Sequence, residues 1–373
     1  MNTKFWDSKR VLITGNTGFK GSWLTLLLQS LGAEVIGFSL PPPTEPSLFE
    51  LSRADHGIVM VYGDIRNRSV VQETMDRYRP QIVMHLAAQS LVRASYENPV
   101  ETYDINLMGT VHILDAMRNT PGIKAAVMVT SDKCYENQEQ DRPYREEDPM
   151  GGYDPYSSSK GCDELIISAY RRSYFSNNNT ALASVRAGNV VGGGDWAKDR
   201  LVVDAMQAFM HGKPLVLRNP DAVRPWQHVL DPLYGYLMLA EKMWEHGASY
   251  ASAWNFGPGR ESSQSVSQLA NMLCRFWGNG ACWVSDKVPS DQHEANLLLL
   301  DARKAEMNLD WYPQMDAATS LAWTVEWYRA YSKGADMREF TLQQLSDFAA
   351  LSRFYPNHEP PKNKKYGFYP DHP

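Results

Sequence analysis

The chain has 373 residues and a formal net charge of −6 at pH 7. This length exceeds that of a usual single domain, so we expect one large domain or two fused ones. The negative net charge argues against nucleic acid or an anionic membrane as a partner. No apolar run approaches the roughly 18 residues of a membrane span, and the charged N-terminal stretch predicts no signal peptide.

The cysteines are few and widely spaced: Cys134, Cys162, Cys274 and Cys282 form no CxxC pair. This usage is typical of a reduced chain without a disulfide framework or a zinc site. We therefore expect a cytoplasmic protein and no metal site.

A glycine-rich turn follows the first predicted strand, residues 10–14, and precedes an apolar helix, residues 22–31. Strand, glycine turn and helix in this order predict a dinucleotide-binding unit, because glycines let the backbone approach a pyrophosphate and the helix N-terminus offers free N–H groups. The spacing is GxxGxxG rather than GxGxxG. The expected cofactor contacts are Gly15, Thr17, Gly18, Phe19, Lys20 and Gly21.

The next two strands do not show which dinucleotide the protein binds. The strand at residues 34–39 ends without the carboxylate that usually binds the ribose of NAD, which leaves NAD and NADP open. Residues 41–52 are expected to form a loop. After the strand at residues 58–62, Asp64 is either an acceptor for the adenine amine or an acid at a helix N-terminus.

Strands and helices alternate along the chain as far as residue 186, which predicts an α/β fold with a Rossmann-like, doubly wound parallel sheet and a smaller C-terminal α/β substrate lobe. We assign residues 1–188 to the dinucleotide-binding domain, 189–352 to the substrate-binding lobe and 353–373 to an irregular tail. The strand at residues 253–257 is expected to return to the sheet. The glycine-rich segment 187–196 is expected to be a mobile binding loop.

Two polar clusters are the candidate catalytic groups. Ser131, Asp132 and Lys133 follow an apolar strand, residues 125–129, and open α/β sheets place their chemistry at such strand ends. Tyr156 and Lys160 open a predicted helix, residues 156–174, and their spacing of four puts both on one helix face. An ammonium beside a phenol favours the phenolate, which makes the tyrosine a better base. A surface tyrosine–lysine pair is the alternative.

These motifs together resemble the extended short-chain dehydrogenase/reductase superfamily, and within it the nucleotide-sugar 4,6-dehydratases. The shared patterns are TGxxGFxG at residues 14–21, LAA at 86–88, Asn106 in a helix and the set Ser131, Tyr156 and Lys160. The pair Asp132-Lys133 and the runs at residues 18–24, 224–229 and 292–295 resemble the branch that acts on CDP-glucose.

The resemblance implies NAD as the cofactor and a nucleotide sugar as the substrate. It implies catalytic roles for Ser131, Asp132, Lys133, Tyr156 and Lys160, and cofactor contacts from Asp64, Ile65, Leu86, Ala87, Ala88, Tyr156 and Lys160. It also implies substrate contacts from Arg93, Asn189, Arg224 and His293. For Arg224, an ion pair with Asp221 or Asp231 is the alternative.

Two rival functions share this fold. A nucleotide-sugar 4-epimerase has the same cofactor and the same serine, tyrosine and lysine, but needs no acid–base pair beside the serine. A regulator that only senses NAD(P) usually lacks an intact YxxxK. A dehydratase that acts on another nucleotide hexose also remains open.

The resemblance further implies a homodimer, or a higher homo-oligomer, formed by the helices at residues 99–118 and 156–174. Their outward apolar residues are expected to be Leu107, Val111, Leu114, Ile166 and Tyr170. It also implies a role in dideoxysugar synthesis for O-antigen lipopolysaccharide.

Overall fold

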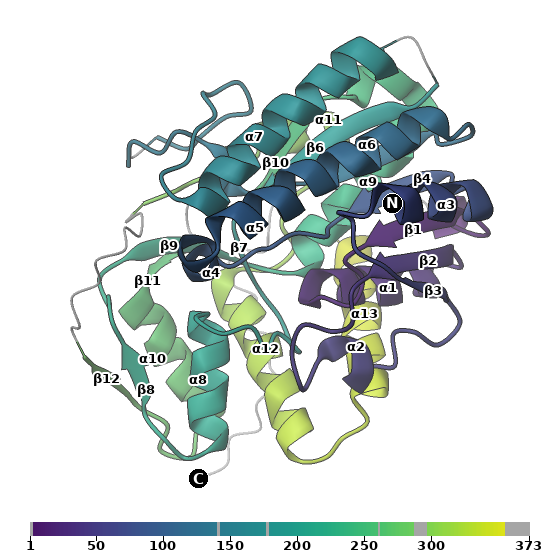
Figure 1. The fold of residues 1–373 in the computed structure, drawn as a ribbon. Coiled ribbons are helices and arrows are strands. Elements are labelled where there is room, and N and C mark those ends of the chain that lie inside the picture. The colour runs from purple at the N-terminus through teal and green to yellow at the C-terminus, as the bar shows by residue number, and fades with distance from the viewer. Residues whose placement is uncertain (1–2, 140–141, 177–178, 260–261, 287–296, 355–373) are drawn as a thin grey trace.

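The structure is a computed structural model that describes residues 3–139, 142–176, 179–259, 262–286 and 297–354. Its centre is a seven-stranded sheet in the order β10-β6-β5-β4-β1-β2-β3, in which every pairing is parallel (Figure 1). The strands are β1 (Arg10–Thr14), β2 (Glu34–Ser39), β3 (Val59–Tyr62), β4 (Ile82–His85), β5 (Ala125–Val129), β6 (Ala181–Ala187) and β10 (Ala253–Phe256). The predicted doubly wound sheet is therefore confirmed, and β10 does return to it beside β6.

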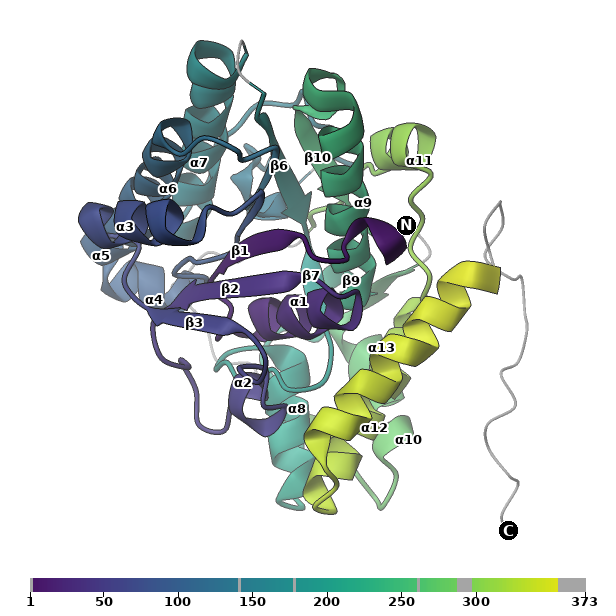
Figure 2. The same ribbon diagram turned by 90° about the vertical axis from the view of Figure 1, so that its right-hand side faces the viewer.

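Helices cover both faces of this sheet (Figure 2). One face carries α3 (Arg68–Tyr78), α6 (Gly109–Asn119) and α7 (Pro155–Tyr170), and the other carries α1 (Phe19–Ser30) and α9 (Leu230–His246). The strands read as continuous apolar runs because both faces are buried. In β1, Leu12 belongs to the core under α3, α6 and α7, whereas Val11 and Ile13 belong to the core under α1 and α9.

The rest of the chain builds two small sheets and further helices around the carboxyl ends of the large sheet. The small sheets contain β7 (Asn189–Val191), β9 (Val223–His228) and β11 (Ser263–Ser265) in one, and β8 (Leu215–Leu217) and β12 (Trp283–Ser285) in the other. The helices are α2 (Leu48–Leu51), α4 (Val92–Glu97), α5 (Pro99–Tyr103), α8 (Leu201–Met210), α10 (Val266–Trp277), α11 (Arg303–Leu309), α12 (Ala317–Ser332) and α13 (Met337–Phe354). Within the described ranges, no helix is both long and apolar enough to span a membrane.

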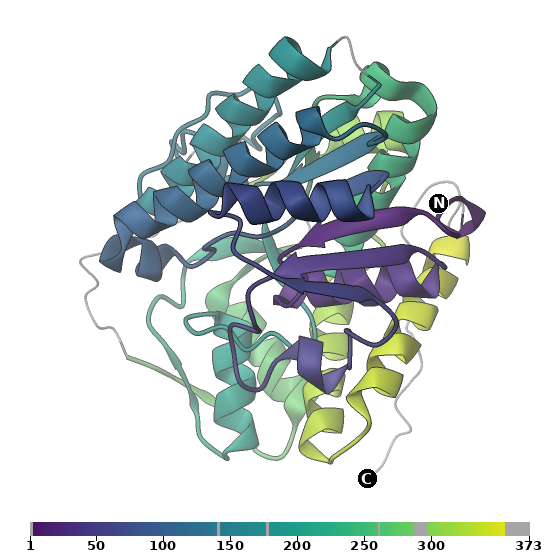
Figure 3. The same ribbon diagram turned by 45° about the vertical axis from the view of Figure 1, so that its right-hand side comes forward.

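The helix α13 was not predicted, and it ties the C-terminal part of the chain to the N-terminal part. Figure 3 shows the yellow C-terminal helices below the purple N-terminal strands, with the blue helices above them. Asp336, just before α13, lies 2.6 Å from Arg53, and Arg338 donates to the Arg53 carbonyl. Phe348 is buried in the core that also contains α1 and α9.

Both long helices expected at residues 99–118 and 156–174 contain a π turn. One turn, Asp104–Met108, joins α5 to α6, and the other, Arg171–Phe175, follows α7. Such wide turns are rare and occur often at functional sites. The first turn contains the buried side chain of Asn106.

Four local expectations were wrong. The helix after the glycine turn begins at Phe19, three residues early, and the expected loop at 41–52 contains α2. The segment 187–196 contains the strand β7, which pairs with β9. Leu114 is buried in the core of its own chain and cannot line an outer surface. The exposed large apolar residues of these helices are Val100, Tyr103, Met108, Leu165 and Tyr174, and the other predicted ones, Leu107, Val111, Ile166 and Tyr170, are half-buried.

Candidate active site

A single large cleft lies at the carboxyl ends of β1, β4, β5 and β6. Ligands of open α/β sheets bind at this edge. The cleft has a volume of about 1620 Å³, larger than the roughly 300–1,000 Å³ typical of a pocket for one small molecule. Every predicted site residue within the described ranges lines it, and His293 lies outside those ranges. The site therefore has room for a dinucleotide and a second ligand together.

The glycine turn shapes one wall of this cleft. Gly15 has a φ of +74°, and a Cβ atom there would lie 2.7 Å from the Ala87 nitrogen, so the fold itself requires glycine. Gly18 is different, because a Cβ atom there would meet only the Gly15 carbonyl, at 3.4 Å. Gly18 caps α1 without a side-chain hydrogen bond, which leaves the N–H groups of the first turn open to the cleft.

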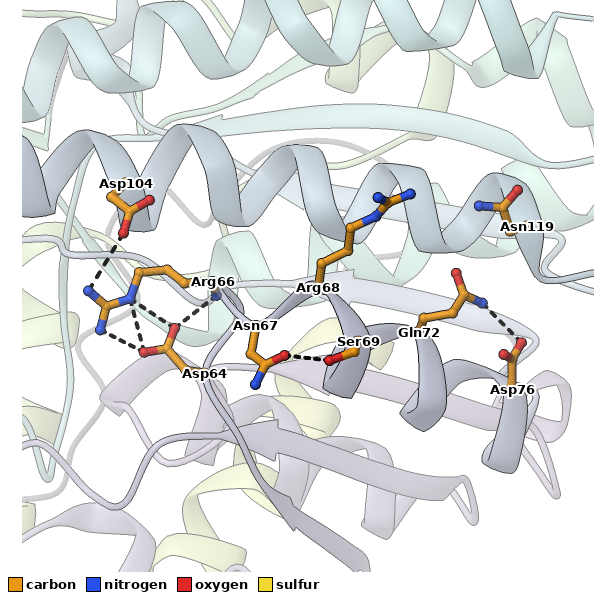
Figure 4. Close-up of a pocket in the computed structure, with 9 residues that line it drawn as sticks. All are labelled: Asp64, Arg66, Asn67, Arg68, Ser69, Gln72, Asp76, Asp104 and Asn119. Atoms are coloured by element: carbon orange, nitrogen blue, oxygen red, sulfur yellow. Dashed lines mark hydrogen bonds and ion pairs between the residues drawn. The ribbon is translucent and has the colours of Figure 1, made fainter.

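The end of β2 offers hydroxyl groups where a carboxylate is usual. The hydroxyl oxygens of Thr17 and Ser39 lie 2.7 Å apart, and the Thr17 hydroxyl donates to the Leu40 carbonyl. Asp64 lies nearby but is held by Arg66 at 2.6 Å, and Arg66 also lies 3.8 Å from Asp104 (Figure 4). The hydrogen bonds from Arg66 hold the pKa of Asp64 below its usual value.

Asp64 is not the cap of the next helix. Asn67 caps α3, and its side chain accepts a hydrogen bond from the Val70 nitrogen. The expectation of a helix N-terminal acid at Asp64 is therefore wrong. Its contact with the adenine stays a prediction, and a carboxylate already paired with Arg66 is a weaker acceptor for it.

The catalytic candidates converge from two elements. Ser131 caps the short 3₁₀ turn Asp132–Cys134 after β5, and its hydroxyl donates to Asp132 at 3.0 Å. Ser131 and Asp132 are buried and Lys133 is half-buried. Tyr156 comes from the first turn of α7, which Asp154 caps by accepting from the Ser157 nitrogen at 2.9 Å.

Lys160 lies one turn further along α7, and its partner was not predicted. The ammonium donates to Asp163 at 3.0 Å, and both side chains are buried. Burial alone would lower the pKa of Lys160, but the Asp163 carboxylate raises it above its usual value. The i, i+3 spacing of the two residues on one helix was the sequence signal that could have revealed the pair.

Lys20, expected only as a cofactor contact, brings a second ammonium to the site, and its side chain is half-buried. Burial lowers the pKa of Lys20 to about 8, and the charge of Arg200 acts in the same direction. Asp132 and Asp195 oppose this effect. Lys20 therefore loses its proton more readily than Lys160, whose pKa is raised.

Asn106 connects the loop after β4 with α7. Its side chain accepts from the Gln89 nitrogen at 2.8 Å, and donates to the Gln89 carbonyl at 3.0 Å and to the Ser159 hydroxyl at 2.8 Å. All three groups of the amide thus have partners, which fixes its orientation. The π turn that contains Asn106 thus ties the loop after β4 to α7.

The predicted substrate contacts within the described ranges come from β7, β9 and α4 and line the same cleft. Asn189 begins β7, and Arg224 lies on β9 with a guanidinium nitrogen 3.0 Å from the Val223 carbonyl. Arg93 lies on α4 and contacts Asp199 at 3.1 Å, and Arg218 contacts the same carboxylate at 3.1 Å. Arg218 also lines the cleft and was missed, because a turn-rich segment gives no signal of where its arginine points.

A buried network supports the catalytic helix from below. Arg186 on β6 lies 2.8 Å from Glu164 on α7, and Glu164 accepts from the hydroxyls of Thr130 and Ser184. Burial alone would raise the pKa of Glu164, but Arg186 holds it below its usual value. The network joins β5, β6 and α7 beneath the site.

Comparison with known proteins decides the family. The family model of GDP-mannose 4,6 dehydratase matches residues 12–322. The chain belongs to this family. A CDP-glucose 4,6-dehydratase from Salmonella typhimurium is 47% identical over 357 residues, which cover 94% of this chain and 99% of the relative. A GDP-mannose 4,6-dehydratase from Vibrio cholerae is 26% identical over an alignment that covers 82% of this chain and 90% of the relative.

Solved structures of other proteins share the fold. A UDP-glucose 4-epimerase from Stenotrophomonas maltophila, with bound NAD and formylated UDP-arabinopyranose, has a TM-score of 0.77 at 23% identity and covers 88% of this chain and 100% of its own. A dTDP-glucose 4,6-dehydratase from Bacillus anthracis, in complex with NAD, has a TM-score of 0.72 at 24% identity and covers 88% and 99%. These likenesses establish the Rossmann-like fold of the chain.

Proposed function

We propose that this protein is an NAD-dependent CDP-glucose 4,6-dehydratase, a hydro-lyase that converts CDP-D-glucose into CDP-4-keto-6-deoxy-D-glucose. The observation that carries the proposal is the 47% identity to the Salmonella enzyme over almost the whole of both chains. The lining of one cleft by Ser131, Asp132, Lys133, Tyr156 and Lys160 supports the same chemistry.

The site fits NAD. The open space at Gly18, the free N–H groups of the first turn of α1 and the small residues Ala87 and Ala88 leave room for a pyrophosphate and a flat ring. Thr17 and Ser39 supply hydroxyls beside the expected ribose. When bound, NAD supplies a reversible hydride acceptor at the sugar C4.

The residues of this chain then have distinct tasks. We assign to Tyr156 the removal of the proton from the C4 hydroxyl, and to Lys160 the stabilisation of the phenolate. Ser131 donates a hydrogen bond to the C4 oxygen as it becomes a ketone, which requires its hydroxyl to turn away from Asp132. The ketone acidifies the proton on C5.

Elimination needs a base at C5 and an acid at the C6 oxygen. We assign the acid to Asp132, which gives its proton to the leaving C6 hydroxyl, and the base to Lys133, which takes the proton from C5. Water leaves across C5–C6, the hydrogen removed from C4 ends on C6, and Lys133 gives back to C5 the proton that it took. The proton that Tyr156 took from the C4 hydroxyl replaces, through solvent, the one that Asp132 gave. No net oxidation occurs, so the cofactor is recycled within one turnover.

We further propose that Arg224 and Asn189 bind the substrate diphosphate and that Arg93 lies by the sugar. A guanidinium suits phosphate oxygens through its paired donors. In this arrangement residues 1–188 hold the cofactor and residues 189–352 supply most of the substrate contacts.

A homodimer, a cytoplasmic location and a role in dideoxysugar synthesis for O-antigen are also proposals, and they rest on the resemblance. Val100, Tyr103, Met108 and Leu165 support the dimer, since they leave an exposed apolar surface on α5, α7 and the π turn between α5 and α6. Sedimentation at micromolar concentration should give the mass of a dimer, and a monomer alone would reject it.

Incubation with CDP-, dTDP-, UDP- and GDP-hexoses tests the function. A 4-keto-6-deoxy product absorbs in alkali, so one assay separates a dehydratase from a 4-epimerase and ranks the bases. We expect the absorbing product with CDP-glucose at a rate above that with any other base. Epimerised sugar without this product would make the protein an epimerase instead.

A further inference from the structure

Asp163 is a buried carboxylate with no part in the chemistry assigned above. It lies three residues after Lys160 on α7, and its side chain has a relative exposure of 2%. One carboxylate oxygen accepts from the Lys160 ammonium at 3.0 Å. The other oxygen, Oδ1, is buried and has no hydrogen-bond partner within the described residues.

Within the part of the chain that the structure describes, the elements packed against α7 bring no second carboxylate into an ion pair with Lys160. Burial raises the pKa of Asp163 to about 6, and Lys160 and the nearby Thr110 hydroxyl on α6 oppose this effect, although Thr110 makes no hydrogen bond of good geometry to Oδ1. The Thr110 hydroxyl lies 3.3 Å from His85 at the end of β4. Burial lowers the pKa of His85 to about 3, and the charge of Lys160 acts in the same direction, so this imidazole is neutral. Asp163 is therefore the carboxylate in direct contact with the catalytic ammonium.

Stability does not explain the pair well. Removing two charges from water costs energy that their attraction repays only with good geometry and full hydrogen bonding, and Oδ1 is left unpaired here. A buried polar group that is only partly satisfied calls for a functional explanation. The neighbouring position, Glu164, carries the structural ion pair with Arg186.

We propose that Asp163 is a positioning residue for the hydride-transfer step, holding the Lys160 ammonium charged and in place and so setting the pH range in which Tyr156 and Lys160 work. This inference rests on the proposed function for its catalytic consequence, but the electrostatic coupling itself does not.

The sign of the effect follows from the charges around Lys160. The titratable groups that interact with it are Tyr156, Asp163 and Glu164 on α7, Lys20 on α1 and His85 on β4. Removing the negative charge of Asp163 makes every proton on the Tyr156–Lys160 pair easier to lose. Because the two groups interact, the two titration steps belong to the pair, and both move to lower pH.

The first test compares pH–rate profiles of Asp163→Asn and Asp115→Asn with that of the wild type. Asp115 on α6 is also ion-paired, with Arg68 and Arg118, but lies away from Lys160, so it controls for the loss of a carboxylate from this helix layer. We expect the acidic and basic limbs of the kcat–pH profile of Asp163→Asn to shift to lower pH by about one unit. A neighbouring charge typically shifts a pKa by about 1 to 3 units, and we expect the lower end of this range. Asp115→Asn should keep the wild-type profile.

A role that is only structural would lower kcat at every pH without moving either limb, and that result would overturn the proposal. Asp163→Glu keeps the charge and should keep both limbs in place. A shift of a full pH unit in Asp163→Glu would also overturn the proposal, whether or not the asparagine variant folds.

The second test needs neither substrate nor turnover. In protein labelled with ¹³C in tyrosine and lysine, the signals of Tyr156 and Lys160 are assigned by their loss in Tyr156→Phe and Lys160→Met. As the pH rises, one of these two side chains loses its proton before the other. That first deprotonation should occur at lower pH in Asp163→Asn than in the wild type. An unchanged titration would reject the role of Asp163, whereas a shifted titration in a protein inactive on CDP-glucose would reject only the proposed function.

Discussion

Asp132 and Lys133 are adjacent in sequence but do not form an ion pair within the described structure. The Asp132 carboxylate is buried and accepts a hydrogen bond from Ser131 at 3.0 Å, while the half-buried Lys133 side chain lines the cleft. A salt bridge between them would have held the lysine charged and unfit as a base. Their separation is consistent with the proposed roles of Asp132 as the acid at the C6 oxygen and of Lys133 as the base at C5.

Lys133→Ala should therefore oxidise C4 but stop before water is lost. Hydride transfer needs Ser131, Tyr156 and Lys160, none of which the change touches. We expect absorbance from reduced nicotinamide to accumulate in a single turnover without alkali-absorbing product. Lys198→Ala, which removes another exposed lysine of the cleft, is the control and should alter KM at most. Normal product formation by Lys133→Ala would reject its role in elimination.

Tyr156→Phe should abolish turnover and leave the fold intact. The phenol makes no hydrogen bond with any described residue, so its removal costs little stability, whereas loss of a general base typically costs a factor of about 10² to 10⁴. Steady-state kinetics and circular dichroism check both parts. Tyr62→Phe on β3, where the side chain is exposed, should be as active as the wild type, and a Tyr156→Phe enzyme within a few-fold of it contradicts the assignment.

Arg186→Met should destabilise the protein strongly, because it leaves the buried Glu164 carboxylate without its cation. Breaking a buried pair by removing one partner costs about 3–5 kcal/mol. Adding Glu164→Gln in the same chain should recover part of the loss. Urea unfolding gives the free energy of unfolding of both variants. A decrease of less than about 1 kcal/mol for Arg186→Met would show that the fold does not depend on the Arg186–Glu164 ion pair.

Lys20→Met should stabilise the ligand-free protein at neutral pH. The folded pKa of Lys20 is about 8 and its usual value is 10.5, so holding the charged lysine in the fold is unfavourable below pH 8. This cost shrinks as the pH rises from 8 to 10.5 and is absent above that range. Thermal unfolding should show a higher Tm for the variant at pH 7 and a smaller difference at pH 10. A difference that does not change with pH would contradict the shift.

Much of the sheet could be predicted because each strand is a short apolar run with a turn on either side. The glycine turn after β1 and the polar cluster after β5 are local patterns, and local patterns suffice when parallel strands bring their ends to one edge. The return of β10 to the sheet was predicted from the short run Trp254 to Phe256, which lies between two predicted helices.

The errors have a different cause. α13 has as many polar as apolar residues and enters the core through a few of them, such as Leu345 and Phe348, so its apolar periodicity is weak. β7 lies in a glycine-rich run that reads as a loop, and only its pairing with β9 makes it a strand. Leu114 lies on a helix with apolar residues on more than one side, and sequence alone does not tell which side meets the sheet.

The ion-pair partners of the charged side chains could not be predicted from the sequence either. Arg66 curls back onto Asp64 two residues away, and Arg93 meets Asp199 from a distant part of the chain. The contact between Lys160 and Asp163 was within reach of helix periodicity, but the burial that makes it matter depends on α6 packing over α7.

CDP-glucose carrying deuterium at C4 shows whether the hydrogen removed from C4 returns to C6 of the same molecule. We expect a 4-keto-6-deoxy product that retains the deuterium at C6, with no net reduced nicotinamide, as measured by mass spectrometry and proton NMR. Deuterium that stays at C4 in an epimerised sugar, or that is lost to solvent, would contradict this expectation.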